Sequence, residues 1–396
     1  MSNKLFINLF NAKKEKVLWF FSFLLMGLSI VYLIKGFYHL IFVNDIESAK
    51  DLLARWLEQQ YIYRGQYPYY ARPGTPNVIK ELGPVLSGGY PPWAFFTGFI
   101  FFPNFSWPVT RIYFAFLNVI SLIVLAVFSY SITAPKNKAQ AFFSVASSLA
   151  ISTACTTLKV GQYGLIINAL LIGAFWLYQN KKYIWTGLFL GLALAKPNIS
   201  AFYFLIFLAR RQFKVIVMFF SFIIVEIFLI LFITRMQPVN IFNNFIQQLN
   251  YFVLKGTSLL NLLSFNQNIP PNLLVFLLGG VSFISLLMVF YLFRNVSLLT
   301  LFAISCLIAR LVTYHRTYDD VMLVFLLLAF LKITYRNPQT TTIVIFIVLG
   351  LSLWLPAGMT PLLYPYWTIF QFIIWVIALV YLLIDEVKTN QKINNF

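Results

Sequence analysis

Apolar runs long enough to cross a lipid bilayer recur along this chain from Val17 almost to its C-terminal end. A spanning helix needs about 17 to 25 mostly apolar residues, because backbone polar groups in hydrocarbon must bond within the segment. The composition agrees, since 60% of the 396 residues are apolar and the mean hydropathy is +0.81, outside the range of soluble domains. The sequence therefore predicts an all-α polytopic membrane protein, in which residues 1–396 form one bundle.

The first run, Val17–Val43, is too long for the apolar region of a cleaved signal peptide, so we expect it to stay as a helix. Further runs bring the expected total to about twelve spans. They are 109–132, 139–157, 161–179, 184–195, 197–209, 213–234, 273–293, 296–313, 320–335, 341–355 and 364–384. Two of them, 184–195 and 197–209, are short and are separated by Lys196-Pro197, so we expect broken or half-inserted helices there.

Basic residues set the expected orientation. The stretch "NAKKEK" precedes the first run, and positive residues favour the cytoplasm, so 1–16 and 385–396 are predicted to be cytoplasmic tails. The net charge of +18 comes mostly from short loops between apolar runs, which indicates topology rather than a nucleic-acid partner. This threading places 44–108 and 235–272 outside as two extracytoplasmic loops.

The first of these loops begins "NDIESAKDLLARWLEQQ". Its apolar residues fall at helical spacing with charges on the opposite side, which predicts an amphipathic helix at the membrane surface. These residues are Ile46, Ala49, Leu52, Leu53, Trp56 and Leu57. A Tyr-, Pro- and Gly-rich stretch follows, and then "GGYPPWAFFTGFIFFP", whose apolar part is too short to span.

Asp45 stands where the first helix is expected to leave the bilayer. Asn44 or Asp45 could cap the amphipathic helix, with Glu47 completing a capping box. A partly desolvated carboxylate at this position could instead serve as a general base. Both readings stay open at the level of sequence.

A second polar group occurs in "VTYHRTYDDV", residues 312–321. One reading is a solvated loop with balanced charges. Against it, His315 and Asp319 are four residues apart, as are Arg316 and Asp320, so each pair would share a helical face. With Arg310 nearby, the cluster is suited to binding a phosphate, whereas one histidine and two aspartates make a weak metal site.

Two further polar points fall on the same predicted side. Lys159 precedes "GQYG" at 161–164, and Lys196 precedes Pro197. Gln162 offers an amide to sugar hydroxyls, although each point could equally be a plain helix boundary with a snorkelling lysine. Isolated charges inside the runs, Glu226 and Lys35, are what a transporter would need near the bilayer midplane.

The cysteines Cys155 and Cys306 are far apart and lack further ligands at metal spacing, so we expect small core residues.

Several of these segments together resemble the family-87 glycosyltransferases, which are polytopic GT-C-type enzymes typified by polyprenol-phosphate-mannose-dependent mannosyltransferases. The most specific match is "GQYGLIINALLIGAFWLYQNKKYIWTGLFLGLALAKPN" at 161–198. "YPP" at Tyr90 to Pro92 is a second match, and Asp45 with Trp56 resembles the opening loop of the family. The late loop departs from it, because "YHRTYDD" replaces a tryptophan-histidine pairing.

The resemblance implies transfer of a hexose, mannose above all, from a polyprenyl-phosphate sugar to a glycolipid or glycan acceptor. The transfer would be a single inverting displacement on the extracytoplasmic side of the cell membrane, with no cofactor and no metal. Asp45 would be the general base. His315 and Arg316 would contact the donor phosphate, and Lys159, Gln162, Lys196, Arg310 and Tyr90 would add substrate contacts. Asp319 and Asp320 would orient His315 and Arg316.

A transporter or flippase of a lipid-linked substrate is the alternative. Transporters concentrate polar residues near the bilayer midplane, whereas most polar residues of this chain fall at predicted helix ends. We therefore expect an enzyme.

Overall fold

The computed structural model describes residues 2–85, 89–253, 271–358, 362–363 and 365–394. All regular elements within these residues are helices, as the sequence predicts. The α-helices are α1 (Ser2–Ile41), α2 (Lys50–Tyr63), α3 (Trp93–Phe101), α4 (Trp107–Thr133), α5 (Lys138–Leu149), α6 (Thr153–Val160), α7 (Gly164–Gln179), α8 (Tyr183–Ala193), α9 (Pro197–Ser200), α10 (Tyr203–Ala209), α11 (Phe213–Thr234), α12 (Pro238–Val253), α14 (Pro271–Leu292), α15 (Leu298–Val312), α16 (Val324–Arg336), α17 (Thr340–Trp354) and α19 (Tyr366–Asn394). Two short 3₁₀ helices, η1 (Pro68–Tyr70) and η2 (Thr317–Leu323), complete the set.

Four described helices are long and apolar enough to cross a membrane, namely α4, α11 and the parts of α1 and α19 at Glu15–Ile41 and Tyr366–Thr389. The predicted span 139–157 is instead two helices, α5 and α6, bent by 46°. The predicted spans that correspond to α7, α8, α15 and α17 are helices of 11 to 16 residues, which at 1.5 Å per residue fall short of an ~30 Å hydrocarbon core. The predicted span 273–293 corresponds to α14, which has 22 residues. The all-helical architecture is confirmed. That each of the twelve expected spans crosses the membrane stays a prediction.

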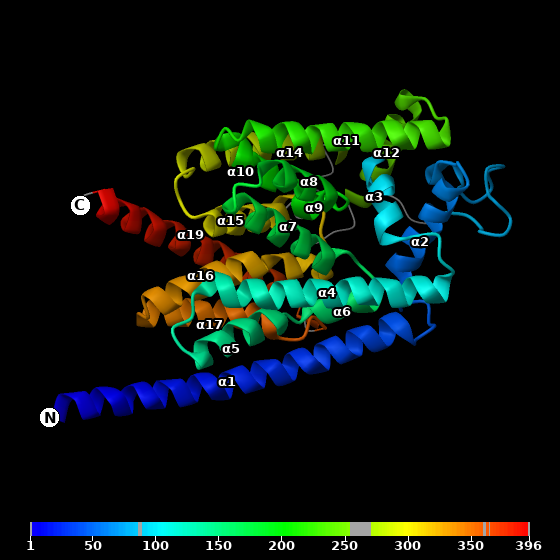
Figure 1. The fold of residues 1–396 in the computed structure, drawn as a ribbon. Helices are drawn as coiled ribbons and strands as arrows, with labels where there is room; N and C mark the ends of the chain where they lie inside the picture. Colours follow the sequence, from blue (N-terminus) through cyan, green and yellow to red (C-terminus); the bar gives the residue numbers. More distant parts are fainter. Residues whose placement is uncertain (1, 86–88, 254–270, 359–361, 364, 395–396) are drawn as a thin grey trace.

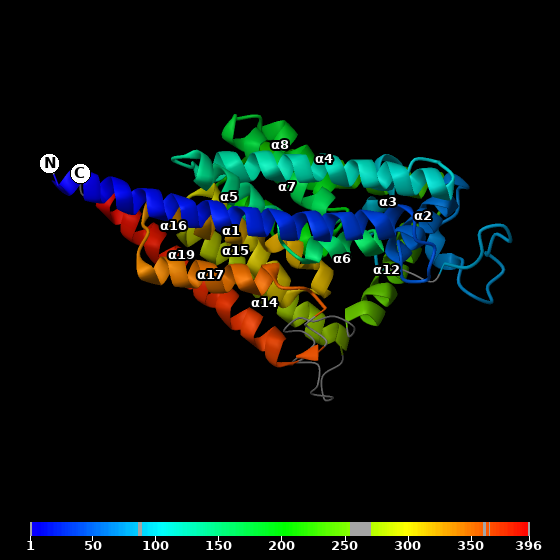
Figure 2. The ribbon, with the colours of Figure 1, turned by 90° about the horizontal axis from the view of Figure 1, so that it is seen from below.

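The centre of the bundle is formed by α15 and α16. Every residue from Val321 to Leu331 is buried, because α16 is apolar on all sides and is enclosed by its neighbours. Around this pair, α1 packs along α5 and α6, and α11 packs along α8 and α3 (Figures 1 and 2).

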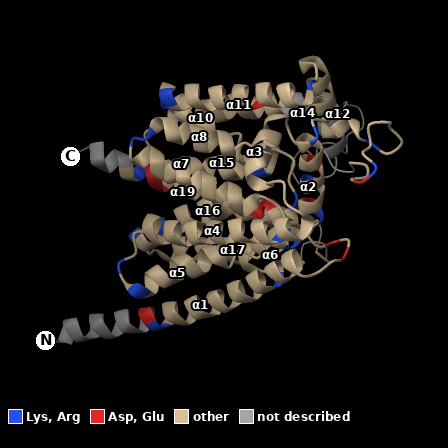
Figure 3. Cartoon of the chain, turned by 45° about the vertical axis from the view of Figure 1, so that its right-hand side comes forward, with Lys and Arg blue, Asp and Glu red and all other residues tan. Residues whose placement is uncertain are grey.

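The two ends of the bundle differ in what they carry. Both termini lie at one end, while α2, α3 and the loop between them lie at the other (Figure 1). Basic residues mark the turns at the end with the termini (Figure 3). The second predicted outer loop, 235–272, contains α12, and its residues 254–270 lie outside the described residues.

Arg111 on α4 fixes the point at which the chain leaves α1. Its guanidinium donates to three carbonyl oxygens, those of Leu40 at 2.6 Å, Val43 at 2.7 Å and His39 at 3.0 Å, and also to the side chain of Asn44. The last carbonyls of a helix have no partner within the helix. Arg111 supplies one and thereby positions the segment that leads to α2.

Candidate active site

The helix α2 turns its polar side toward the protein. Arg55, Glu58 and Gln59 are buried, whereas Leu53 is 44% exposed and Ile46, in the preceding loop, is 91% exposed. The predicted amphipathic helix therefore exists, and the structure shows that charged side chains on its polar side pack against the protein. Tertiary contacts decide the orientation, because Arg55 and Glu58 form an ion pair with each other and Arg55 also meets Tyr163.

Asp45 does not cap α2. The helix begins at Lys50, and its N-cap residue is Ala49, whose side chain makes no cap hydrogen bond. Asp45 instead closes a turn before the helix, where its carboxylate accepts hydrogen bonds from the backbone N–H of Glu47 at 3.0 Å and of Ser48 at 2.5 Å. The hydrogen bonds with Ser48 lower the pKa of this exposed carboxyl below its ordinary value.

Gln162 is the hub of a polar network at the same end of the bundle. Its amide N–H donates to Asp51 of α2 at 2.7 Å and to the hydroxyl of Tyr318 at 3.3 Å. Its carbonyl oxygen accepts from Lys196 at 2.9 Å and from the hydroxyl of Tyr90 at 3.4 Å. One side chain thus links the first loop, α9 and η2.

Gly161 allows this approach. It ends α6 with φ of 74°, in the left-handed region that glycine adopts without strain. A Cβ at this position would meet the Cβ of Leu52 at 2.4 Å, so only glycine lets α2 lie this close to α6. The backbone N–H of Ala49 also donates to the carbonyl of Lys159 at 2.7 Å, which ties the loop to the end of α6.

The innermost part of the network joins Lys196, Asp319 and His315. Lys196 forms an ion pair with Asp319, and the other carboxylate oxygen of Asp319 lies 3.1 Å from Nδ1 of His315. Nε2 of His315 lies 2.9 Å from the hydroxyl of Thr313. All three members of the group are buried, and buried charges are tolerated only when paired in this way.

The electrostatics of this group favour a charged carboxylate beside a neutral imidazole. Burial alone would raise the pKa of Asp319, but Lys196 and the hydrogen bond from His315 hold it well below its usual range. Burial lowers the pKa of His315, and its hydrogen bond with Asp319 offsets only part of that shift. At neutral pH the imidazole is therefore uncharged, with Asp319 favouring the proton on Nδ1.

Arg310 and Arg316 take different partners from those expected. Asp320 forms its ion pair with Arg310, not with Arg316, because 317–323 is a 3₁₀ helix and the four-residue spacing no longer defines one face. Arg316 is half-buried and donates from Nε to the hydroxyl of Tyr314 at 2.9 Å. Within the described residues its terminal nitrogens have no hydrogen-bond partner, which leaves them open to an anion.

Tyr90 rests on a buried cation. The guanidinium carbon of Arg55 lies 3.7 Å from the centre of the Tyr90 ring, and Nε of Arg55 donates to the hydroxyl of Tyr163 at 3.2 Å. Burial alone would lower the pKa of Arg55, but the carboxylate of Glu58 raises it above the ordinary value. A permanently charged guanidinium under the ring holds Tyr90 in place through a cation–π contact.

The structure brings most of the predicted site residues together, but not all. Those that meet in one network or beside it are Tyr90, Gln162, Lys196, Arg310, His315, Arg316, Asp319 and Asp320. The side chains of Asp45 and Lys159 make no hydrogen bond to this network among the described residues. Sequence reasoning missed Asp51, Arg55 and Glu58, although their spacing of four and three residues marks one face of a helix.

The remaining intramembrane charges lie apart from the network. Glu226 on α11 is buried and accepts a hydrogen bond from Thr97 of α3 at 2.6 Å. Lys35 is exposed on α1. Of the two free cysteines, Cys306 is buried and Cys155 is half-buried.

These features define a helical membrane protein with a charge-rich site at one end of its bundle. The model of glycosyltransferase family 87 matches residues 89–335, which is more than half of the 396 residues. The chain belongs to this family and is a glycosyltransferase. No curated protein and no solved structure matches it. The matched region contains Tyr90, Gln162, Lys196 and His315, while Asp45 and Asp51 precede it.

Proposed function

We propose that this glycosyltransferase moves a hexose, mannose above all, from a polyprenyl-phosphate sugar to a hydroxyl of a glycolipid or glycan acceptor. The transfer takes place at the end of the bundle that carries α2, which we assign to the extracytoplasmic side of the cell membrane. The observation that carries the proposal is the hydrogen bond from Gln162 to Asp51. Gln162 thereby connects this carboxylate of the first loop to Lys196. Lys196 pairs with Asp319 of η2, and Asp319 in turn accepts a hydrogen bond from the backbone N–H of Arg316.

Direct displacement needs two groups on opposite sides of the sugar. The acceptor oxygen attacks the anomeric carbon while the bond from that carbon to the phosphate oxygen breaks. The hydroxyl proton passes to a carboxylate, and the departing phosphate carries the negative charge away. Arg316 is suited to the phosphate because its terminal nitrogens are open and a guanidinium binds phosphate oxygens in pairs.

We assign the base to Asp51 in preference to Asp45. Asp51 is half-buried, and in the described residues it accepts a single side-chain hydrogen bond, from Gln162. Its second oxygen is thus available for an acceptor hydroxyl. Asp45 is exposed and uses its carboxylate to close a turn, which supports a structural role. The assignment of Asp45 as base stays the competing prediction.

We propose an indirect role for His315, through its contact with Asp319. It is completely buried, and its hydrogen bond with Asp319 helps to fix the carboxylate that holds both Lys196 and the backbone N–H of Arg316. We therefore propose that it positions the phosphate-binding groups.

The test is transfer of labelled sugar by the purified protein in lipid vesicles. Polyprenyl-phosphate mannose is supplied together with a membrane glycolipid extract, and other polyprenyl-phosphate hexoses are supplied in parallel. We expect labelled glycolipid from the mannose donor. Asp51→Asn is expected to lower kcat by at least about 100-fold, the usual contribution of a general base, with little change in KM for the donor. Asp45→Asn is the matched control and is expected to retain most of the activity.

Two outcomes would change the proposal. If Asp45→Asn abolished transfer while Asp51→Asn remained active, the base would be Asp45. If no polyprenyl-phosphate sugar were consumed although a nucleotide sugar was, the donor class would be wrong.

A further inference from the structure

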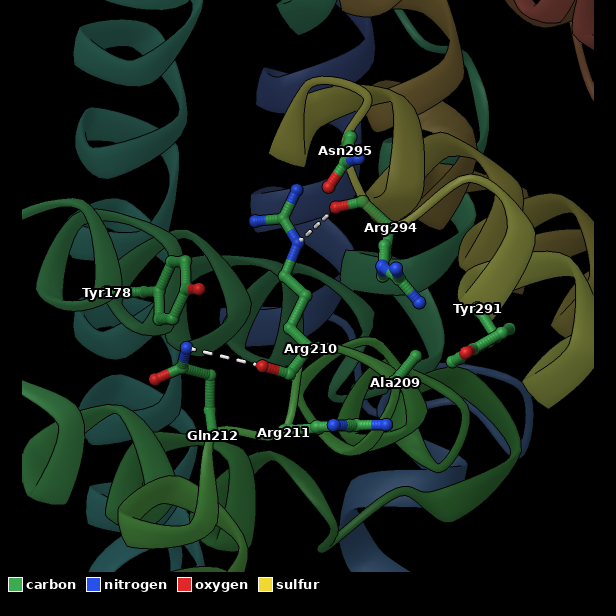
Figure 4. Close-up of a pocket in the computed structure, with 8 residues that line it drawn as sticks. All are labelled: Tyr178, Ala209, Arg210, Arg211, Gln212, Tyr291, Arg294 and Asn295. Carbon is green, nitrogen blue, oxygen red and sulfur yellow. Dashed lines mark hydrogen bonds between the residues drawn. The ribbon is translucent and has the colours of Figure 1, made fainter.

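A pocket of about 460 Å³, drawn in Figure 4, lies between turns at the end of the bundle opposite to α2 and α3, whose ribbons Figure 1 shows. It is formed where the turn between α10 and α11 meets the turn between α14 and α15. Three arginines line it, Arg210, Arg211 and Arg294, together with the tyrosines Tyr178 and Tyr291. The proposed transfer reaction has no use for these residues, because its groups lie at the α2 end.

Arg210 is held in place by the neighbouring turn. Its Nε donates to the carbonyl of Arg294 at 3.0 Å (Figure 4). Its Nη2 donates to the carbonyl of Val296 at 2.8 Å. These carbonyls orient the guanidinium without neutralising its charge. Arg294 in turn lies over the ring of Tyr291, at 4.6 Å from the ring centre. The pocket is therefore a preformed arrangement of cations.

No acidic side chain balances these cations in the described part of the chain. None of the three arginines takes part in the ion pairs found there. The acids of α19 are engaged elsewhere, since Asp385 pairs with Arg336 and Glu386 accepts hydrogen bonds from Ser297 and Thr300. Three positive charges around one pocket create a positive potential that favours binding of an anion.

Arg211 lies in the turn that ends α10. Arg211 follows α10 with φ of 55°, in the left-handed region that favours glycine. The turn is closed by the N–H of Gln212, which donates to the carbonyl of Phe207 at 2.8 Å. A cation is favourably placed at a helix C-terminus.

The pocket adjoins surfaces suited to acyl chains. On α11, Phe213 is 68% exposed and Val217 is 64% exposed, and on α14, Leu292 is 73% exposed and Met288 is 61% exposed. Both helices thus carry apolar side chains outward directly beside the arginines. A molecule with a phosphate head and hydrocarbon tails would satisfy both surfaces at once.

We infer that this pocket binds the phosphate group of an anionic membrane phospholipid. The guanidinium groups of Arg211 and Arg294 contact the phosphate oxygens, Arg210 maintains the shape of the site, and the acyl chains lie along α11 and α14. The inference does not depend on the sugar donor or on the base of the transfer reaction.

Lipid binding to the purified full-length protein tests the inference. Native mass spectrometry counts bound phosphatidylglycerol, phosphatidylcholine and inorganic phosphate, each titrated separately. We expect phosphatidylglycerol to bind at least ten times more tightly than phosphatidylcholine, because the choline cation opposes the arginines. We expect inorganic phosphate alone not to saturate the pocket.

The decisive variant is the double substitution Arg211→Gln, Arg294→Gln, which leaves the structural Arg210 intact. It is expected to weaken phosphatidylglycerol binding at least tenfold. Lys136→Gln, Lys138→Gln is the matched control, since it removes the same charge from the turn between α4 and α5 and from the first residue of α5. It is expected to leave binding unchanged. Arg211→Lys, Arg294→Lys is a second variant that keeps the charge, and it is used if the glutamine variant fails to fold. We expect it to retain part of the affinity of the parent protein for phosphatidylglycerol.

The inference is overturned if the control weakens binding as much as the arginine variant, because general surface charge would then explain the affinity. Equal binding of phosphatidylglycerol and phosphatidylcholine would also overturn it. Tight binding of inorganic phosphate alone would also overturn it, because the ligand of the pocket would then be a soluble phosphate and not a lipid.

Discussion

His315 is surrounded by charges that act on its proton in opposite directions. Asp319, through its hydrogen bond and its charge, raises the pKa of the imidazole, whereas Arg310 and Lys196 lower it. Burial is the largest effect and lowers the pKa further, so the pKa of His315 in the folded protein lies below the ordinary histidine value of about 6.5. The neutral imidazole is thus part of the folded state, and a proton added to it would meet two cations.

We predict that this histidine makes stability depend on pH. Below about pH 6.5 the unfolded chain takes up a proton that the folded chain refuses. The contribution is therefore complete above pH 6.5 and is lost as the pH falls toward the folded pKa, by at most about 1.4 kcal/mol per pH unit. The thermal unfolding midpoint, measured between pH 7.5 and 5.5, should fall less steeply for His315→Gln than for the parent protein.

Asp319 does not confound this measurement. Its folded pKa is lowered, so its contribution is present above the unfolded value of about 3.9 and is lost only below it. His39, the other histidine of the chain, supplies the matched control as His39→Gln. If His315→Gln and the parent protein followed the same pH dependence, the neutral-imidazole assignment would be wrong.

At the scale of the element, α2 is a helix held by its polar face. Arg55 and Glu58 are buried as a pair, and the cation of that pair lies under Tyr90. The hydrogen bond from Gln162 to Asp51 attaches the first turn of the same helix to the site. The position of α2 thus determines where the Tyr90 ring and the Asp51 carboxylate lie, and we propose that the transfer reaction uses both.

We predict that Glu58→Ala destabilises the protein by about 3 to 5 kcal/mol, because removing one member of a buried ion pair leaves an uncompensated charge. The matched control is Glu47→Ala. Glu47 makes the same type of pair, with Lys50, but its side chain is 62% exposed, and surface pairs contribute little. The thermal unfolding midpoint should drop only for Glu58→Ala, and equal midpoints would contradict the buried orientation of α2.

At the scale of the whole molecule, the bundle has a buried polar network at one end and basic turns at the other. The first loop, the end of α6 and η2 converge on Gln162 at one end. The termini lie at the other end (Figures 1 and 3). The turns that form the pocket of three arginines, between α10 and α11 and between α14 and α15, lie at that end too. Because basic loops are retained in the cytoplasm, the end with the termini is expected to face it.

Labelling of single cysteines from either side of the membrane tests this orientation. In a Cys155→Ser, Cys306→Ser background, Glu47→Cys is expected to react with a membrane-impermeant maleimide on intact cells. Lys181→Cys, at the exposed turn between α7 and α8, is expected to react only after the membrane is opened. The reverse pattern would place the site on the cytoplasmic side and exclude an extracytoplasmic transfer reaction.

Local patterns predicted most helices within a few residues. The run 109–132 corresponds to α4 at Trp107–Thr133, and 213–234 coincides with α11. Breaks inside apolar stretches were harder to predict. The stretch 139–157 bends between α5 and α6, where the N–H of Ser152 donates to the carbonyl of Leu353. Because Leu353 is distant in sequence from Ser152, the local sequence does not predict this bend.

By itself, the sequence determined that this chain is a bundle of apolar helices. It also indicated that Gln162, Lys196 and the 312–321 stretch are polar site candidates at helix ends. Hydropathy and charge are local properties, which is why they could be read directly. Only the tertiary structure decided which face of α2 is buried and which of two nearby aspartates reaches Gln162. The physical reason is that a buried charge is stable only beside its partner, and the partners of α2 come from elements far along the chain.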